Sequence, residues 1–283
     1  MSEPCKVSVV IPCFNHGEFV QEAVDSVIKA KRDDMELIVV DDGSTDEHTH
    51  KEIDALSTRG IKVIRQENMG VGPARNTAIL ASQGDYIFPL DADDRLRPAG
   101  IDHGIRKLDS DPKVGVVYGD VEFFGTLTGR WKVGALDVQR MMEWNYLPVS
   151  ALFRRSIWEQ NQGYDGTMPV QGLEDWDFWL GALEHGWQFE YVPEVFFEYR
   201  KASESMLTRT SGFEPAIKEF VAKKHGALYQ QAWLSVLRER DLLATERKSV
   251  KRTLHNLRRL LKARIKQKFA TGAAALRREH AAR

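Results

Sequence analysis

The feature that most constrains the fold is the regular alternation of strand-like and helix-like segments over the first 118 residues. Short apolar runs of strand length lie at about 7–12, 37–40, 61–65, 86–90 and 114–118. Between them, apolar periodicity and helix-start signals predict helices over about 18–31, 44–57, 72–81 and 98–110. Because strands that alternate with helices pair in parallel, we expect an α/β fold with a Rossmann-type, mostly parallel sheet flanked by helices.

One of these helix starts carries a specific signature. Ser44 is followed three residues later by Glu47, which is the spacing of a capping box, in which the two side chains satisfy free backbone N–H groups of the first turn. We therefore expect the second helix to begin at Ser44.

The rest of the chain departs from this alternation. Residues 119–212 are mixed, with a helix expected over about 175–185. Short strands are expected there at about 121–124, 150–153 and 189–192. From about residue 214 onward the pattern is helical without strand signals. The chain is therefore expected to comprise three regions, 1–118, 119–212 and 213–283.

Charge separates the C-terminal region from the remainder. From Arg238 to the end there are 15 Lys and Arg against 4 Asp and Glu, whereas the remainder has 25 against 37. A helix here would carry Leu254, Leu257 and Leu261 on one face with cations around it, a pattern that suits an anionic membrane surface. A solvated helix that packs on its own domain or on a neighbouring chain fits the pattern equally well. Nucleic acid is not expected as a partner, because the basic segment lacks interleaved aromatic residues.

Several protein classes are not expected. No apolar run approaches the roughly 20 residues that cross a bilayer, and the N-terminal residues do not have the pattern of a secretory leader. The two cysteines, Cys5 and Cys13, lie before or within the first strand and are expected to remain thiols. We therefore expect a cytoplasmic protein, peripheral on the inner face of the membrane if the basic helix attaches there.

Three carboxylates come directly after one predicted strand. Asp91, Asp93 and Asp94 follow the run at 86–90, and ligands in open α/β sheets bind at the carboxyl ends of strands. Alternation along an extended chain places Asp91 and Asp93 on the same side. Since Mg²⁺ and Mn²⁺ usually combine one or two carboxylates with substrate phosphates, we expect a divalent metal (Mn²⁺ or Mg²⁺) with a diphosphate here. The alternative is that Asp91 and Asp94 cap the following helix.

A second acidic pair ends the strand at 37–40. Asp41 and Asp42 would face the same crevice, where several carboxylates are costly without a cation or sugar hydroxyls. Asp41 is the candidate ligand. Asp42 is as well explained by a turn at Gly43, because Asp-Gly is a common turn pair.

Four segments in order resemble the family 2 glycosyltransferases, whose N-terminal half is a nucleotide-sugar-binding GT-A fold. They are VSVVIPCFNHGEFV, IVVDDGSTD, NMGVGPARNTAI and LDADD, spread over about residues 6–118. The resemblance implies a D-x-D motif in the last segment, with Asp91 toward the ribose and Asp93 toward the metal. Taken together, it implies donor-binding roles for Pro12, Phe14, Asn15, Asp41, Asn68, Gly70, Arg75, Asp91, Ala92 and Asp93.

One segment is a lookalike of another site. Gly70-Val71-Gly72-Pro73-Ala74-Arg75 begins like a dinucleotide-binding loop, but Arg75 stands where such a loop needs a small residue for helix packing. A nicotinamide enzyme is therefore disfavoured. Arg75 itself could pair with the carboxylates or a diphosphate, or could make a purely structural ion pair.

Three acids open the helix predicted at about 175–185. Glu174, Asp175 and Asp177 alone indicate only a favourable acidic first turn. The family resemblance implies more: Asp175 as the general base for the acceptor, with Glu174 on acceptor hydroxyls. Trp176 would offer a flat platform for an acceptor sugar ring, although it is equally well explained as a core residue.

A last resemblance lies at 196–206, where FFEYRKASESM is similar to the family's Y-R-x-H-x-x-S segment. Ala202 stands at the histidine position. Either the metal relies on Asp93 and the diphosphate, or Arg200 or Lys201 neutralises the leaving group. The other histidines show no paired metal-ligand spacing.

The resemblance implies a metal-dependent, inverting glycosyltransferase that moves a sugar from a nucleoside diphosphate sugar, with a UDP-sugar expected, to a hydroxyl of a carbohydrate or lipid-linked acceptor in polysaccharide or glycolipid assembly. The nucleotide-sugar-binding half would be 1–118, the acceptor and base half 119–212, and the helical, basic extension 213–283. A nucleotidyltransferase is one alternative, but it would need a Gly-rich, basic loop in place of PCFNHG after the first strand. The other is a non-catalytic nucleotide-sugar-binding component of an assembly complex, which would not need Asp175.

Overall fold

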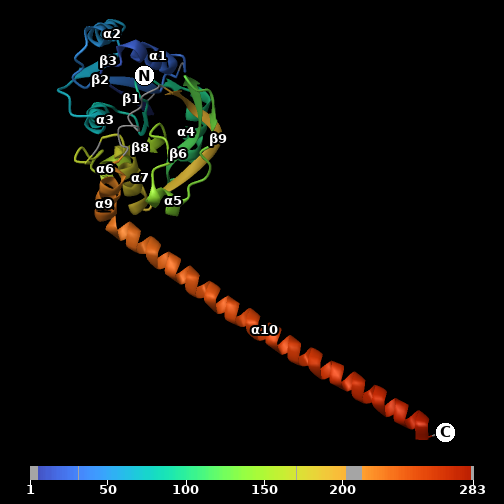
Figure 1. The fold of residues 1–283 in the computed structure, drawn as a ribbon. Helices are drawn as coiled ribbons and strands as arrows, with labels where there is room; N and C mark the ends of the chain where they lie inside the picture. Colours follow the sequence, from blue (N-terminus) through green and yellow to red (C-terminus); the bar gives the residue numbers. More distant parts are fainter. Residues whose placement is uncertain (1–5, 31, 170, 202–211, 282–283) are drawn as a thin grey trace. The chain divides into compact units, whose positions relative to one another are not determined.

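The computed structural model describes residues 6–30, 32–169, 171–201 and 212–281. Within them the elements follow in chain order as β1 (Val7–Cys13), α1 (Gly17–Ile28), β2 (Met35–Asp41), α2 (Glu47–Thr58), β3 (Lys62–Arg65), α3 (Val71–Leu80), β4 (Tyr86–Pro89), β5 (Arg95–Leu96), α4 (Pro98–Ser110), β6 (Val114–Gly125), β7 (Gly129–Trp131), α5 (Val138–Glu143), β8 (Leu152–Arg154), α6 (Arg155–Gln160), α7 (Glu174–Glu184), β9 (Gln188–Lys201), α9 (Glu214–Lys224) and α10 (Gly226–Ala281) (Figure 1).

One nine-stranded sheet runs through the described residues in the order β3-β2-β1-β4-β8-β6-β9-β5, with β7 paired to β6 off this path. The pairs β3·β2, β2·β1, β1·β4 and β6·β9 are parallel. Strand β8 runs antiparallel between β4 and β6, which brings β6 and β9 back to the direction of β1. The expected α/β fold with a mostly parallel sheet is thus confirmed. As a consequence, β1, β2, β4, β6 and β9 all end at the same edge of the sheet.

Helices cover the sheet because its strands bury both of their faces. All seven residues of β1 are buried, which explains why every position except Ser8 is apolar. Helix α3 packs on β1 and β2, and α4 packs on β6, β8 and β9. The approach of α4 requires glycine: a Cβ on Gly100 would lie 2.8 Å from the Phe196 Cα atom. The largest fully buried side chains include Phe88, Tyr118, Phe153, Trp176, Phe178, Trp179 and Phe196.

The capping box expected at Ser44 is wrong. Helix α2 begins at Glu47, and its N-cap is Asp46, whose carboxylate accepts a hydrogen bond from the Thr49 N–H at 2.7 Å. The Ser44 hydroxyl oxygen instead accepts the Asn15 N–H at 3.0 Å. The Ser44 side chain, which the local spacing assigned to the helix start, therefore bonds to the loop after β1 instead.

Strand β6 joins two segments that were expected to be separate. The predicted strands at 114–118 and 121–124 form one strand, whose register against β9 shifts at Gly119 and Asp120. The residues at these register shifts interrupt the strand pattern in the sequence, but β6 remains paired with β9 on both sides of them. The predicted regional border at 118 therefore falls inside a strand, and the two halves share one sheet.

Helices are present from residue 214 onward, but the border between the two compact units lies later than the regional border predicted at 213. The chain divides into two compact units, Met1–Tyr229 and Gln230–Arg283. Helix α9 belongs to the first unit, because Ile217 and Val221 are fully buried in its core. The sequence does not reveal this packing, because the apolar face of a short helix with basic flanks differs little from that of a solvated helix.

A buried ion cluster fastens the end of α9 to α7. His225, which is 3% exposed, bonds through Nε2 to Asp177 at 2.9 Å and through Nδ1 to Glu184 at 2.8 Å. Lys224 contacts the second carboxylate oxygen of Asp177 at 2.8 Å. Burial lowers the pKa of His225, but the two carboxylates outweigh burial and raise it above the ordinary value of 6.5, which favours the charged ring.

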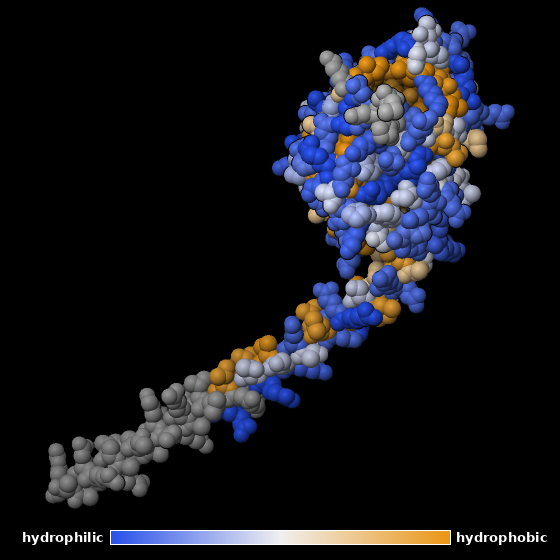
Figure 2. Space-filling model, turned by 180° about the vertical axis from the view of Figure 1, so that it is seen from behind, coloured by the Kyte–Doolittle hydropathy of each residue, from blue (hydrophilic) through white to orange (hydrophobic). Residues whose placement is uncertain are grey.

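The second unit consists of the greater part of α10. Its described side chains include a row of exposed apolar residues, among them Leu243, Val250, Leu254 and Leu257, and Figure 2 shows apolar surface gathered along one side of this helix. The side chain of Leu261 lies outside the described residues. In the part of the chain that the structure describes, no helix combines the length and the apolar character needed to span a bilayer.

Candidate active site

The acidic loops gather at one edge of the sheet. Asp41 ends β2 and Asp91 to Asp94 follow β4, with β1 between these two strands. Burial, together with the neighbouring carboxylates of Asp41 and Asp93, raises the pKa of the Cys13 thiol, at the end of β1, to about 12. The two acidic segments are therefore neighbours across the end of β1, as expected from the sheet topology.

The loop after β1 is tied to the loop after β2. Asn15 adopts a left-handed backbone conformation with φ of 54°, and its side-chain oxygen accepts the Thr45 N–H at 2.7 Å. Pro12 is buried, whereas the Phe14 ring is 43% exposed and remains available to a ligand. Asp41 is almost fully buried and accepts the Ser44 N–H at 3.0 Å. The contacts of Asn15 thus support the loop shape, while Phe14 faces solvent.

Asp42 anchors the next loop, a role that sequence reasoning missed. Its carboxylate accepts hydrogen bonds from the Gln66 side chain at 2.7 Å, the Met69 N–H at 3.0 Å and the Gly70 N–H at 2.8 Å. Gly70 has φ of 95°, a conformation suited to glycine. Asn68, in the same loop, is exposed. The buried charge of Asp42 therefore shapes the loop that carries the predicted donor residues Asn68 and Gly70.

Arg75 joins the two sides of the site. It lies in α3, is 2% exposed, and contacts Asp91 at 2.7 Å and Glu174 at 2.5 Å with its two terminal nitrogens. Burial alone would lower the pKa of Arg75, but the charges of Asp91 and Glu174 have the larger combined effect and hold the pKa above its usual range. The pairing with carboxylates expected from the sequence is present. It connects the loop after β4 to the first turn of α7.

The acidic loop after β4 divides into anchored and unpaired groups. Asp94 is 1% exposed; its Oδ1 atom accepts the Arg200 N–H at 2.9 Å, while its Oδ2 atom has no hydrogen-bond partner among the described residues. Ala92, between Asp91 and Asp93 in the chain, is buried. Helix α4 begins only at Pro98, so the alternative in which Asp91 and Asp94 cap it is wrong.

Asp93 is the acid of this loop that no other described residue hydrogen-bonds through its side chain. It is half-buried, and its pKa is raised first by burial and then by the nearby charge of Asp91. An unpaired carboxylate beside a second acid is the environment in which a cation is favourable. Among the described residues, no group of three His, Cys, Asp or Glu side chains could hold a metal by itself. Two carboxylates completed by substrate phosphates would still suit Mg²⁺ or Mn²⁺.

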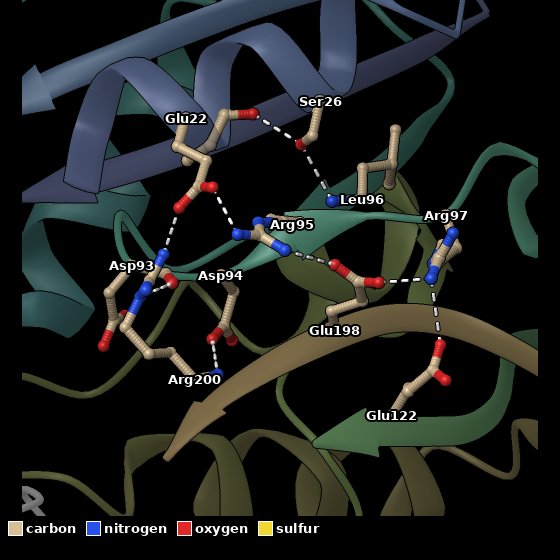
Figure 3. Close-up of polar contacts among 11 residues, drawn as sticks. Glu22, Ser26, Asp93, Asp94, Arg95, Leu96, Arg97, Glu122, Glu198 and Arg200 are labelled. Atoms are coloured by element: carbon tan, nitrogen blue, oxygen red, sulfur yellow. Dashed lines mark hydrogen bonds and ion pairs between the residues drawn. The ribbon is translucent and has the colours of Figure 1, made fainter. Parts of the chain in front are cut away.

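Arg200 lies beside this loop at the end of β9. Its Nε donates to the Asp93 carbonyl oxygen at 2.9 Å, and its guanidinium pairs with Glu22 (Figure 3). The guanidinium also lies over the Phe19 and Phe124 rings. Glu22 also pairs with Arg95, so that Arg200 belongs to an ion-pair network that crosses α1, β5 and β9.

The next residue along β9 makes different contacts. The Lys201 ammonium lies 4.4 Å from the centre of the Tyr199 ring and 4.7 Å from that of Phe123, and burial lowers its pKa. Both predicted leaving-group residues therefore lie at the edge of the sheet where Asp93 is found. Ala202, at the position of the family's histidine, lies outside the described residues.

Asp175 lies in the first turn of α7, directly after the Glu174 that pairs with Arg75. Its carboxylate accepts hydrogen bonds from the Asn145 side chain and from the Trp176 N–H, both at 2.8 Å. Burial, followed by the nearby charge of Glu174, raises the pKa of Asp175 to about 7. A carboxylate with a pKa near neutrality suits a general base that operates at neutral pH.

Two neighbours of Asp175 differ from expectation. Trp176 is fully buried and its ring N–H donates to the Met141 carbonyl oxygen at 2.6 Å, so the prediction that it forms an acceptor platform is wrong and the core alternative holds. Both oxygens of Glu174 are occupied, one by Arg75 and the other by the Gly172 N–H at 2.9 Å. Glu174 therefore holds Arg75, and the structure gives no free oxygen that would bind an acceptor hydroxyl.

Comparison with known proteins matches this geometry to one family. The model of glycosyl transferase family 2 matches residues 8–169, which is more than half of the chain. The chain belongs to glycosyl transferase family 2. It is thus a glycosyltransferase, and the resemblance inferred from the four sequence segments is confirmed.

Individual relatives agree with this assignment. The glycosyltransferase GlyG of Streptococcus pneumoniae is 29% identical over 223 residues, covering 71% of this chain and 72% of the relative. Chondroitin synthase of Escherichia coli is 26% identical over 199 residues, which are 68% of this chain but only 28% of that enzyme. The structure of S. aureus TarS 1–349 in complex with UDP-GlcNAc is similar with a TM-score of 0.60 and 19% identity, covering 72% of this chain and 60% of the TarS chain. The fold is that of the GT-A glycosyltransferases.

The Arg75 bridge leads to a first prediction. Arg75→Lys leaves a single ammonium that cannot hold Asp91 and Glu174 in the same planar geometry, so both partly buried carboxylates lose fixed partners. We expect a loss of stability of roughly 3 kcal/mol and a fall in kcat/KM of about 100-fold, measured by urea unfolding and by release of nucleoside diphosphate.

The matched control is Arg155→Lys. Arg155 makes three hydrogen bonds, to the Gly84 and Ile79 carbonyls and to Ser82, without contact to the site carboxylates. This variant is expected to lose stability but to keep its kcat/KM below the unfolding transition. Equal activity losses in the two variants would show that Arg75 contributes only to folding.

Proposed function

We propose that this glycosyltransferase transfers a sugar from a nucleoside diphosphate sugar to an acceptor hydroxyl with inversion of configuration. The observation that carries the proposal is the Arg75 bridge, in which one buried guanidinium joins Asp91 of the acidic loop after β4 to Glu174, the residue that precedes Asp175. A single-displacement reaction needs such an arrangement: groups for the leaving diphosphate on one side and a base for the attacking hydroxyl on the other.

The donor is proposed to be a UDP-sugar held at the sheet edge. The exposed ring of Phe14 and the neighbouring Pro12 would contact the base, and Asp41 would bind the base or ribose. Asp91 would contact the ribose with the oxygen that Arg75 leaves free. The complexes of S. aureus TarS with UDP-GlcNAc and with UDP support this class of donor. Residues 1–118 would supply most of these contacts, with Asn15, Asn68, Gly70 and Ala92 shaping the loops.

The unpaired carboxylate of Asp93 would hold Mn²⁺ or Mg²⁺ together with the donor diphosphate. Bound there, the metal supplies positive charge where negative charge develops on the leaving diphosphate. Arg200 and Lys201 would add to this stabilisation, because both lie at the end of β9 beside the acidic loop. Glu22, the acid that pairs with the Arg200 guanidinium, has a partly exposed side chain, so a phosphate could compete for that guanidinium.

Asp175 would remove the proton of the acceptor hydroxyl as that oxygen attacks the anomeric carbon. Its hydrogen bonds from Asn145 and the Trp176 N–H fix the orientation of the carboxylate. Glu174 would act indirectly, by holding Arg75. The region from residue 119 to 212 would thus supply the base and the acceptor side. If the protein were a non-catalytic binder of sugar nucleotides, this carboxylate, with its fixed orientation and its pKa near neutrality, would have no role.

The acceptor is proposed to be a growing carbohydrate or a lipid-linked sugar in polysaccharide or glycolipid assembly. Similarity to chondroitin synthase of Escherichia coli supports a carbohydrate acceptor. The basic, apolar-striped α10 supports attachment to the inner face of the membrane, where a lipid-linked acceptor would be presented.

A second prediction tests the base. Asp175→Asn keeps the shape of the side chain but cannot accept the proton, so transfer should fall on the order of 10³-fold. Binding of UDP-GlcNAc with Mn²⁺, measured by calorimetry, should stay within about twofold, because Asp175 lies on the acceptor side. In the parent enzyme the rate should rise with pH through about 7, since the ionised carboxylate is the active form.

The control for this test is Asp109→Asn. Asp109 pairs with Lys6 and Tyr86 and makes no contact with the site residues. Transfer should persist in this variant. Transfer at the parent rate in Asp175→Asn would remove Asp175 from its proposed role.

A third prediction concerns the tail. Leu243→Glu places a charge on the apolar side of α10 and should weaken binding to vesicles rich in phosphatidylglycerol several-fold, without changing UDP-GlcNAc affinity. Thr245→Glu adds the same charge two residues along the helix, roughly opposite Leu243, and should weaken binding less. Equal effects of the two variants, or no binding by the parent protein, would contradict membrane attachment through this face.

A further inference from the structure

Asn145 contacts the proposed base from a segment without a sequence pattern. It follows α5 in the chain, and its Nδ2 donates to the Asp175 Oδ2 atom at 2.8 Å. Its Oδ1 atom accepts the Leu147 N–H at 3.0 Å. Because the backbone donor at Leu147 needs the amide oxygen, the NH₂ group is directed at Asp175.

We propose that Asn145 is a positioning residue for Asp175, whose carboxylate it holds in one orientation and in the ionised form that accepts the acceptor proton. The proposal rests on the proposed function of Asp175 as the base. Asn145 touches neither the donor loops nor Arg75 in the described contacts, so it would act through Asp175 alone.

The segment that carries Asn145 is fixed on two sides. From α7, the Trp176 ring N–H donates to the Met141 carbonyl at 2.6 Å, and the Trp176 ring lies 5.4 Å from that of Trp144. From the start of α10, the Tyr229 hydroxyl donates to the Met142 carbonyl at 2.6 Å. The amide of Asn145 therefore approaches Asp175 from a braced backbone, which is what a positioning group requires.

Residues after β9 contribute to this brace. Lys218 of α9 lies 5.5 Å from the centre of the Trp144 ring, on the segment that presents Asn145. The ion cluster of Lys224 and His225 holds Asp177, two residues beyond Asp175 on the same turn of α7. The part of the chain that looked like the start of a basic extension thus supports both elements that meet at Asp175.

The charges around Asp175 show what the amide adds. Glu174 on α7 raises the pKa of Asp175, and Arg75 on α3 lowers it. The Tyr164 hydroxyl also lies within electrostatic range, but burial raises its pKa and keeps it neutral. Besides Arg75, the hydrogen bonds from the Trp176 N–H and from the Asn145 side chain favour the carboxylate over the acid. Removal of Asn145 would leave the Trp176 N–H as the only one of these two hydrogen bonds.

The test is the titration of Asp175 in Asn145→Ala, followed by ¹³C NMR of aspartate-labelled protein, with the resonance assigned by its absence in Asp175→Asn. We expect the midpoint to rise by roughly one pH unit. Release of UDP from UDP-GlcNAc, with Mn²⁺ and the best sugar of an acceptor panel, should fall about tenfold near neutral pH and recover at alkaline pH. The KM for UDP-GlcNAc should stay nearly unchanged.

Asn161→Ala is the matched control. Asn161 also donates its side-chain N–H to α7, at the Phe178 carbonyl with a distance of 2.9 Å, but it does not contact Asp175. It should lower the melting temperature without moving the titration of Asp175. Asn145→Asp, which adds a like charge, should raise the midpoint further than Asn145→Ala.

The outcomes separate the two claims. An unchanged Asp175 midpoint in Asn145→Ala, with Asp175→Asn inactive, would overturn the positioning role and leave the base in place. Full transfer activity in Asp175→Asn would overturn the proposed function itself, whatever the titration shows. A uniform loss of rate at every pH in Asn145→Ala would also count against positioning, since it would reflect a general loss of structure.

Discussion

The Arg75 guanidinium is the interaction on which the site depends. It is almost fully buried and joins Asp91, after β4, to Glu174, at the start of α7. These two carboxylates are 83 residues apart in the sequence. A buried charge of this kind destabilises the fold unless opposite charges pair with it. Removal of any one of the three groups would therefore destabilise the other two. The planar fork of arginine matches two carboxylates at once, which lysine cannot do. Because of this bridge, the loop after β4 and the first turn of α7 keep a fixed relation.

Around this bridge, carboxylates of similar appearance have different tasks. Asp42 and Asp94 are buried and bond to backbone N–H groups, so they shape the loops that surround the site. No other described residue hydrogen-bonds the Asp93 side chain, which is the one we propose for a ligand. Asp175 has two donors and a pKa near neutrality. The differences come from burial and hydrogen bonding, and the residue type alone does not reveal them.

The sequence predicted what depends on local periodicity and on segment order. The apolar run of β1 and the proline that opens α4 are read directly from neighbouring residues, and the order of the segments predicts that Asp41 and Asp91 meet at one sheet edge. What escaped prediction depends on long-range contacts. Asn145 lies in a segment without periodicity, and only the fold brings it to Asp175.

The errors have the same physical origin. Ser44 has the spacing of a cap, but the neighbouring loop takes its hydroxyl. Trp176 could equally have been a surface platform or a core residue, and only the packing against Trp144 and the bond to Met141 decide. The docking of α9 depends on Ile217 and Val221 finding a surface that is far away in sequence.

The central claim is that Asp93 and the acidic edge of the sheet hold a cation together with a pyrophosphate. Anomalous diffraction at the manganese edge, from crystals grown with UDP and Mn²⁺, tests it most directly. The account predicts one anomalous peak bonded to the Asp93 carboxylate and to oxygens of the UDP diphosphate. A diphosphate bound away from Asp93, or manganese located elsewhere in the protein, would contradict it.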